Sequence, residues 1–272
     1  MNPTNAFRLL VIVVWSLMVS LSHADSPMAN YEQGVQLGAQ EKFAEAKAAF
    51  ERGLQVDAQS APSRNCLTVL EDVQAHRIKD QTGVHLFRAF ASFNRFRTDD
   101  AIQELNRAAE LDPRYALTYS HRGDAYADKG QSDKALADYN QALEINPRYA
   151  TAYLNRGILY AKQSRLDQAL ADYNRALEAD PGNQSAYYTR GNLHAQQGRY
   201  AEALADYDRL LEINPRYGHA YVRKGMACEK AGRPQDALAA YKGYLQKVDL
   251  KVQDPRQVQF VQDKIKSLEK QP

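Results

Sequence analysis

Side chains that could carry catalysis or hold a metal are few in this sequence, and they are widely separated. It contains no HExxH, no phosphate-cradling glycine loop, no CxxC and no GxSxG. The histidines beyond residue 25 have no metal-ligand spacing. The nearest approach to an acid pair, Asp124 and Asp128, is four residues apart with no base close in sequence. The sequence therefore predicts no catalytic residue, no metal and no cofactor.

A basic residue followed by glycine recurs within stretches that otherwise resemble helices. The pair occurs in HRGDAY, NRGILY, TRGNLH and RKGMAC. Glycine inside a helix costs about 1 kcal/mol relative to alanine, so its recurrence indicates a close approach between two helices that a side chain would prevent. The accompanying cation lies on a face expected to be packed, where it requires a partner of opposite charge.

The chain is organised by a period of 34 residues. Pro113, Pro147, Pro181 and Pro215 are each 34 residues apart, and repeat position 1 falls three residues after each proline. Each period contains two segments with apolar residues at helical spacing, separated by a glycine or serine, and the proline ends the second segment. Self-similarity at this period is typical of a stacked helical repeat protein.

Acidic residues recur with the same period as the cations. We hypothesise a ladder in which the cation at repeat position 7 meets an acid at position 23 of its own repeat or of the preceding one. The ends of the array favour the preceding repeat, because Lys224 would then meet Asp206. The alternative is separate surface charges, each worth ~0–1 kcal/mol. The members are Arg122, Arg156, Arg190 and Lys224, with Arg88 before them, and Glu104, Asp138, Asp172 and Asp206.

These repeats resemble the tetratricopeptide repeat (TPR) family. In one repeat the family positions are occupied by Tyr119, Gly123, Tyr126, Ala135, Tyr139, Ala142 and Pro147. The resemblance implies an all-α, TPR-type superhelical solenoid of helix-turn-helix repeats. The expected parts are a divergent N-terminal repeat at 27–60, an inserted helix or linker at 61–81, a divergent repeat at 82–115, repeats at 116–149, 150–183, 184–217 and 218–251, and a capping helix within 252–272.

The resemblance also implies a concave groove lined by positions 2, 5, 6, 9, 12 and 13 of each repeat. The mixture of amide, aromatic and apolar groups there suits a peptide or protein segment as the partner. Only Arg223 matches the carboxylate clamp of some relatives, so a chaperone tail is not the expected partner. The predicted groove residues are Ser120, His121, Asp124, Leu154, Asn155, Ile158, Lys162, Tyr188, Thr189, Asn192, Gln196, His219, Val222, Arg223 and Met226.

The divergent repeat at 82–115 carries a conspicuously apolar segment. Leu86, Phe87, Phe90 and Phe93 lie close together in it. We expect the inserted helix to cover these side chains. If Phe87 and Phe90 were open instead, they would mark a second binding site.

Residues 1–24 have the layout of a secretory signal peptide. Arg8 precedes an apolar run from Leu9 to Leu21, and the small residues Ser22 and Ala24 follow at cleavage-site spacing. The run is shorter than the ~20 residues of a membrane-spanning helix. We expect cleavage after Ala24 and a periplasmic or secreted protein without a lipid anchor. The alternative is an uncleaved anchor, which is the only membrane contact expected.

The overall charge argues against nucleic acid as a partner. Lys and Arg number 35 against 33 Asp and Glu, which gives a formal net charge of only +2. Cys66 and Cys228 are separated by too many helices to form a disulfide. The sequence therefore predicts a non-catalytic protein-binding scaffold in the cell envelope. The alternatives are an envelope hydrolase, or an enzyme accessory, with a site built across repeats, and a self-assembling structural scaffold.

Overall fold

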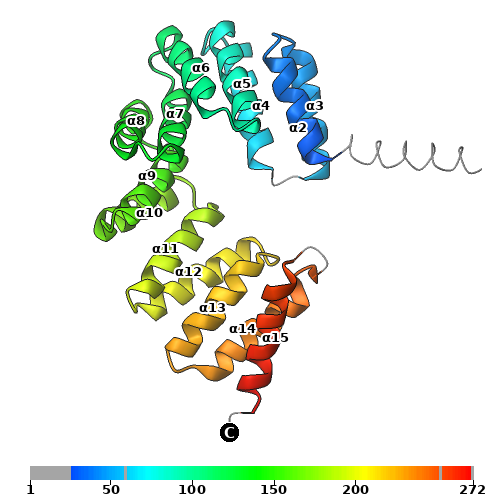
Figure 1. Ribbon diagram of the computed structural model, residues 1–272, viewed down its shortest axis with the longest axis vertical. Helices are drawn as coiled ribbons and strands as arrows, with labels where there is room; N and C mark the ends of the chain where they lie inside the picture. The colour runs from blue at the N-terminus through cyan, green and yellow to red at the C-terminus, as the bar shows by residue number, and fades with distance from the viewer. Residues whose placement is uncertain (1–25, 58–59, 251–252, 271–272) are drawn as a thin grey trace, which may run out of the picture. The chain divides into compact units, whose positions relative to one another are not determined.

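The computed structural model describes residues 26–57, 60–250 and 253–270 (Figure 1). These residues form fourteen α-helices and no β-strand. The helices are α2 (Pro27–Gly38), α3 (Phe43–Val56), α4 (Ala61–Gln74), α5 (Asp80–Asn94), α6 (Thr98–Leu111), α7 (Ala116–Asp128), α8 (Ser132–Ile145), α9 (Ala150–Lys162), α10 (Leu166–Ala179), α11 (Gln184–Gln196), α12 (Tyr200–Ile213), α13 (Gly218–Lys230), α14 (Pro234–Lys247) and α15 (Pro255–Leu268). The chain divides into two compact units, Met1–Ile145 and Asn146–Pro272, which are described separately below.

Both units are built from helical hairpins. In the first unit α2 packs against α3, α5 against α6 and α7 against α8; in the second, the pairs are α9–α10, α11–α12 and α13–α14. Most successive hairpins within a unit stack through the second helix of one and the first helix of the next, as at α6–α7, α10–α11 and α12–α13. The first hairpin instead contacts α5 through α2, and α4 packs against both α3 and α5. The turn inside three of the hairpins contains a glycine with positive φ, such as Gly130 at 71° and Gly198 at 75°. Glycine adopts this left-handed conformation without the steric cost that a Cβ imposes.

In the four repeats between residues 116 and 251, the glycine of the first helix faces a buried tyrosine. A Cβ on Gly123 would lie 2.7 Å from the Tyr139 ring, and one on Gly225 would lie 2.5 Å from the Tyr241 ring. Both rings are at most 2% exposed. The close approach predicted from the sequence is therefore confirmed, and the group brought close to the glycine is the ring of a core tyrosine.

Three of the arginines at repeat position 7 bind the acid of their own repeat. Arg122 donates from Nε and Nη2 to Asp138 at 2.8 and 2.7 Å, and Arg190 does the same to Asp206 at 3.0 and 2.6 Å. Arg156 makes the equivalent pair with Asp172. Hydrogen bonding to Asp138 raises the pKa of Arg122 above its usual value. The preference for an acid of the preceding repeat is wrong, because positions 7 and 23 lie across one hairpin.

The contact with the preceding repeat is made instead to position 25. The third guanidinium nitrogen, Nη1, donates to Asn106 from Arg122 at 2.9 Å and to Asn174 from Arg190 at 2.6 Å. Lys224 follows the same rule and pairs with Asp208 at 2.5 Å, not with Asp206. In the divergent repeat at 82–115, the acid at position 23 does not bind the arginine at position 7. This acid, Glu104, pairs instead with His85 and Arg107.

The apolar segment of α5 is buried chiefly by the first hairpin. Phe87 is fully buried and stacks on Phe50 at a centroid distance of 6.0 Å, with Phe43 6.5 Å away. The expectation that the inserted helix covers this segment is therefore confirmed only in part. Helix α4 contributes to the same core through Leu70 and neighbouring side chains, and packs mainly against α3.

Helix α15 covers the last hairpin, as the sequence predicts. Val261 and Leu268 are buried in the core of the second unit, and Val258 and Ile265 pack against it. Lys264 adds an ion pair of 2.7 Å to Glu229 on α13. A terminal helix of this kind closes the apolar end of a repeat stack.

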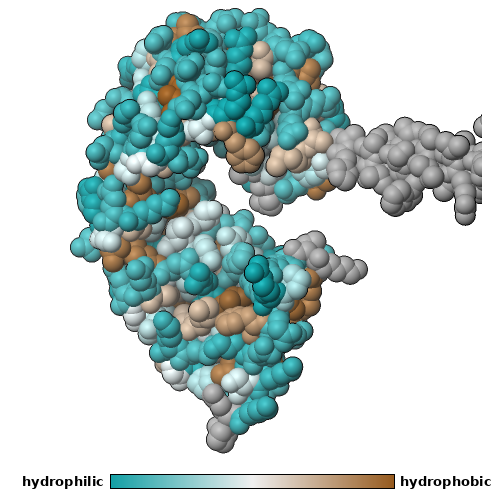
Figure 2. Space-filling model, in the orientation of Figure 1, coloured by the Kyte–Doolittle hydropathy of each residue, from teal (hydrophilic) through white to brown (hydrophobic). Residues whose placement is uncertain are grey.

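The surface of the described residues is largely polar. The face seen in Figure 2 is mostly hydrophilic. Large apolar side chains that are exposed occur singly, at Met28, Val56, Phe96, Leu250 and Phe260. None of the described helices combines the length and the apolar character that crossing a membrane would require. Both cysteines are buried free thiols, one in each unit.

Candidate groove pocket in the second unit

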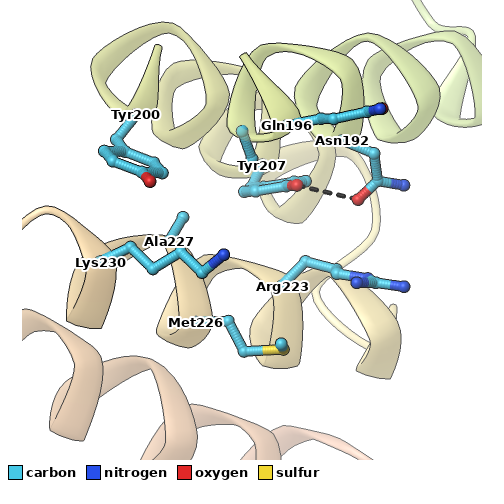
Figure 3. A pocket seen from close by; sticks show the side chains of 9 residues that line it. Asn192, Gln196, Tyr200, Tyr207, Arg223, Met226, Ala227 and Lys230 are labelled. Atoms are coloured by element: carbon cyan, nitrogen blue, oxygen red, sulfur yellow. Dashed lines mark hydrogen bonds between the residues drawn. The ribbon is translucent and has the colours of Figure 1, made fainter. Parts of the chain in front are cut away.

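A pocket of about 320 Å³ opens in the second unit between α11, α12 and α13 (Figure 3). We call it the α11–α13 pocket. Amide, aromatic, apolar and cationic side chains from three helices meet there. Its lining consists of Asn192, Ala195, Gln196, Tyr200, Tyr207, Arg223, Met226, Ala227 and Lys230.

A buried tyrosine of the core fixes one side chain on the α11 side of the pocket. Tyr207 is 1% exposed, and its hydroxyl donates to Asn192 Oδ1 at 2.9 Å. Burial raises the pKa of the Tyr207 hydroxyl, so it remains a donor at neutral pH. Because the Oδ1 of Asn192 is engaged in this bond, its amide nitrogen extends away from Tyr207 (Figure 3). The pocket therefore presents a fixed amide donor whose orientation is set by a buried tyrosine.

The pocket carries two cations that no carboxylate neutralises within the described part of the chain. The Arg223 Nε donates to the Tyr188 hydroxyl at 3.5 Å, and Lys230 runs along the α13 side of the pocket, below the two tyrosines (Figure 3). The nearby acids already have partners. Glu229 is paired with Lys264, and Asp208 with Lys224. The site is thus electropositive and suits a partner that brings a negative charge.

Aromatic side chains extend this surface beyond Arg223. The rings of Tyr188 and Tyr217 have centroids 5.5 Å apart, and His219 lies 6.5 Å beyond Tyr217. Gln257 on α15 lies within hydrogen-bonding distance of the His219 ring, with Nε2 3.4 Å from Nδ1. The terminal helix thereby helps to fix one edge of the aromatic surface.

The structure brings together one group of the predicted groove residues. Asn192, Gln196, Arg223 and Met226 line the α11–α13 pocket. Tyr188 and His219 border it through the contacts described above. Thr189 and Val222 are half-buried, and the Thr189 hydroxyl donates to the Ser185 carbonyl oxygen at 2.8 Å.

The prediction that Ser120 and Leu154 line the groove is wrong, because both side chains are buried. Ser120 is 1% exposed, and Leu154 is 7% exposed within the core formed by α9, α10 and α11. Neither can offer its side chain to a partner. Further along α9, Asn155 and Ile158 are half-buried and Lys162 is exposed, but these residues line none of the pockets described here.

Two of the predicted groove residues of the first unit, His121 and Asp124, contact each other and neighbouring aromatic side chains. Asp124 accepts a hydrogen bond from the Tyr139 hydroxyl at 2.8 Å and lies 3.5 Å from Nδ1 of His121. The His121 ring packs against Phe90 at a centroid distance of 5.0 Å. Phe90 is 5% exposed and borders a mostly apolar pocket of about 230 Å³, whereas Phe87 is core.

Sequence reasoning missed Tyr200 and Lys230. Lys230 occupies repeat position 13, as Gln196 does in the preceding repeat, so the positional rule itself could have identified it. Tyr200 is the first residue of α12 and lies outside that rule. No sequence signal marks Tyr200, because the equivalent residues of the other repeats differ in type.

The described residues contain no cluster of three or more His, Cys, Asp or Glu side chains suited to a metal ion. The chemistry that the α11–α13 pocket does offer is recognition: amide hydrogen bonding, packing against aromatic and thioether groups, and attraction of negative charge.

Solved structures similar to this one are helical repeat proteins. The crystal structure of MamA is 23% identical and aligns with a TM-score of 0.55, over 62% of this chain and 92% of MamA. PilW, a type IV pilus biogenesis factor, is 23% identical with a TM-score of 0.58, over 69% of this chain and 90% of PilW. A tetratricopeptide repeat protein from Parabacteroides merdae is 17% identical with a TM-score of 0.52, over 89% and 86%. At these identities the likeness shows the fold alone.

Comparison by sequence gives the family. Among curated proteins, no sequence is a significant match to this chain. A family profile described as TPR repeat matches residues 97–130 and 123–164, and profiles described as tetratricopeptide repeat match residues 150–183 and 188–251. Together these matches span more than half of the 272 residues, and they coincide with the stacked hairpins. The chain therefore belongs to the tetratricopeptide repeat family.

Proposed function

We propose that this protein is a non-catalytic scaffold that binds a peptide or protein segment, and that the α11–α13 pocket is the centre of its binding surface. The observation that supports this most is the convergence of recognition groups on a rigid wall. Asn192 is oriented by buried Tyr207, and Arg223 and Lys230 face the same pocket without neutralising acids from the described chain. Preorganised groups bind with less loss of conformational entropy than mobile ones.

The pocket matches the chemistry of a peptide. Asn192 and Gln196 are four residues apart, so their amides lie on one face of α11 and can bond the peptide's backbone. Tyr200 and Met226 provide aromatic and thioether surface for an apolar side chain. The cations add attraction for an acidic side chain of the partner.

Site-specific photocrosslinking tests this proposal. A photoreactive residue at Gln196 should crosslink to one partner segment in envelope extracts, and mass spectrometry should map the crosslinks to a short stretch of it. The same residue at Arg209, which is exposed on α12 and outside the pocket, serves as the control. Lys230→Glu should reduce the Gln196 crosslink about tenfold, because it reverses a charge within the site. Equal crosslinking from Gln196 and Arg209 would contradict the placement of the surface.

The proposed location is the bacterial cell envelope or the exterior. Residues 1–24, which carry the predicted signal peptide, lie outside the described residues, so this proposal stands on the sequence pattern. N-terminal sequencing of protein recovered from the periplasm or medium should begin at Asp25. Replacing Ala24 with a bulky leucine should leave most of the protein uncleaved, whereas Ser20→Leu, upstream of the cleavage-site residues, should not. An unprocessed wild-type chain in the cytosol would refute export.

A further inference from the structure

A second polar groove lies in the first unit, beside α5. It has a volume of about 500 Å³ and is lined by α2, α5, α6 and the turn between the last two, and it is distinct from the site proposed above. We call it the α5 groove. Its polar and cationic lining includes Gln36, Gln40, Arg88, Ser92, Arg95 and Gln103.

Ser92 occupies a position that carries a larger side chain in the later repeats. It lies at repeat position 11, where those repeats have Tyr126, Tyr160, His194 and Cys228. A serine occupies much less space than an aromatic ring, and Ser92 lines the α5 groove. Its hydroxyl donates to the Arg88 carbonyl oxygen at 2.9 Å, so the small side chain stays close to the helix. The groove thus coincides with a departure from the repeat pattern.

Arg88 also departs from the pattern of its counterparts. It holds repeat position 7, where Arg122 and Arg190 form two-pronged ion pairs with the acid at position 23. In this repeat that acid is Glu104. It accepts from Arg107 at 2.9 Å and lies 2.6 Å from Nδ1 of His85. Within the described part of the chain no carboxylate pairs with Arg88, and its side chain is exposed to the groove.

Arg95 provides a second cation without an ion pair among the described residues. It follows the last residue of α5 and lines the same groove. The groove's Asp100 is already paired with Arg97. Glu32 borders an adjoining pocket together with Arg95, but no hydrogen bond joins the two among the described residues. Glu104 also lines the groove, where it is paired with Arg107 and His85. The lining thus carries three arginines against Asp100 and Glu104, and Arg88 and Arg95 are its two cations without an ion pair among the described residues.

We propose that the α5 groove binds an acidic peptide segment whose carboxylates are three residues apart. Arg88 and Arg95 are seven residues apart, which places them on one face of α5 at about 10 Å along its axis. In an extended polyproline II chain, three residues span about 9 Å and return to the same face. Each guanidinium can bind one carboxylate through two hydrogen bonds. The amides of Gln36, Gln40 and Gln103 lie along the groove to bond the peptide's backbone.

Fluorescence anisotropy with the full mature chain tests this assignment. The probe is a fluorescein-labelled peptide of repeating Pro-Pro-Glu, and its control is the matched Pro-Pro-Gln peptide. We expect saturable binding of the Glu peptide and at least tenfold weaker binding of the Gln peptide. Equal affinity for the two peptides, or no binding of either, would overturn the proposal.

Variants locate the binding to the groove. Arg88→Gln and Arg95→Gln should each weaken binding of the Glu peptide about tenfold. Arg114→Gln, at an exposed position outside the groove, should leave the affinity unchanged. Ser92→Tyr installs the tyrosine that the repeats at 116–149 and 150–183 carry at this position and should block the groove. Circular dichroism checks that each variant is folded. A loss with Arg114→Gln as large as with Arg88→Gln would show non-specific charge attraction and overturn the site.

Discussion

Replacing Gly225 by alanine is expected to destabilise the protein by about 2 kcal/mol and to lower its melting temperature by about 5 °C. The added Cβ would lie 2.5 Å from Cε1 and 2.6 Å from Cζ of the Tyr241 ring. That ring is fully buried and its hydroxyl is hydrogen-bonded to Glu229, so it has little room to move. The overpacking outweighs the ~1 kcal/mol that alanine gains in helix propensity. Thermal unfolding followed by circular dichroism measures the effect.

Gly53→Ala is the matched control. Gly53 also lies within a helix, but a Cβ there would meet its nearest atom, the Cβ of Asn30, at 3.4 Å. This is ordinary van der Waals contact, so the propensity gain should dominate and the melting temperature should stay the same or rise. If both substitutions shifted the melting temperature in the same direction, the close approach at Gly225 would not explain the recurring glycine.

Replacing Asp206 by alanine is expected to cost about 3 kcal/mol, the largest effect predicted here. The substitution removes both carboxylate contacts of Arg190, at 3.0 and 2.6 Å, while the guanidinium stays largely buried with only 22% of its side chain exposed. A buried charge that has lost its partner retains its desolvation penalty. Chemical denaturation monitored by tyrosine fluorescence measures the change in unfolding free energy.

An exposed ion pair serves as the control for this prediction, and a double variant tests whether the unpaired Arg190 charge causes the loss of stability. Glu212→Ala breaks the exposed ion pair with Arg209 in the same helix and should cost less than 1 kcal/mol. Combining Arg190→Leu with Asp206→Ala removes both charges and should be less destabilising than Asp206→Ala alone. Additive effects of the two single substitutions would show that the pair contributes no coupling.

The hairpins could be predicted from the sequence because local signals fix them. The prolines at a period of 34, the helical spacing of apolar residues and the recurring glycine each depend on near neighbours in the chain. The partner of each arginine could not be chosen in the same way. Reasoning from the ends of the array favoured Asp206 for Lys224, whereas the packing of adjacent hairpins brings Asp208 to it.

The groove was only partly predictable because the positional rule treats every repeat as identical. It found Asn192, Gln196, Arg223 and Met226, which do line one pocket. It also selected Leu154, which is buried by neighbours whose sizes the rule does not consider. The α5 groove has a sequence signal in Ser92, which stands where the later repeats carry Tyr126, Tyr160, His194 and Cys228. Whether Arg88 in this groove has an acid partner depends on which side chains Glu104 binds. The folded hairpin decides this, because it brings His85 and Arg107 to Glu104.

The bonds from Arg122 to Asn106 and from Arg190 to Asn174 have a thermodynamic consequence. Each guanidinium is shared between its own hairpin and the one before it, so the free energy of a hairpin depends on whether its neighbour is folded. In repeat proteins such nearest-neighbour terms set the length over which the array unfolds as one cooperative block. The recurrent arginine thereby links the stabilities of adjacent repeats and opposes fraying of single hairpins.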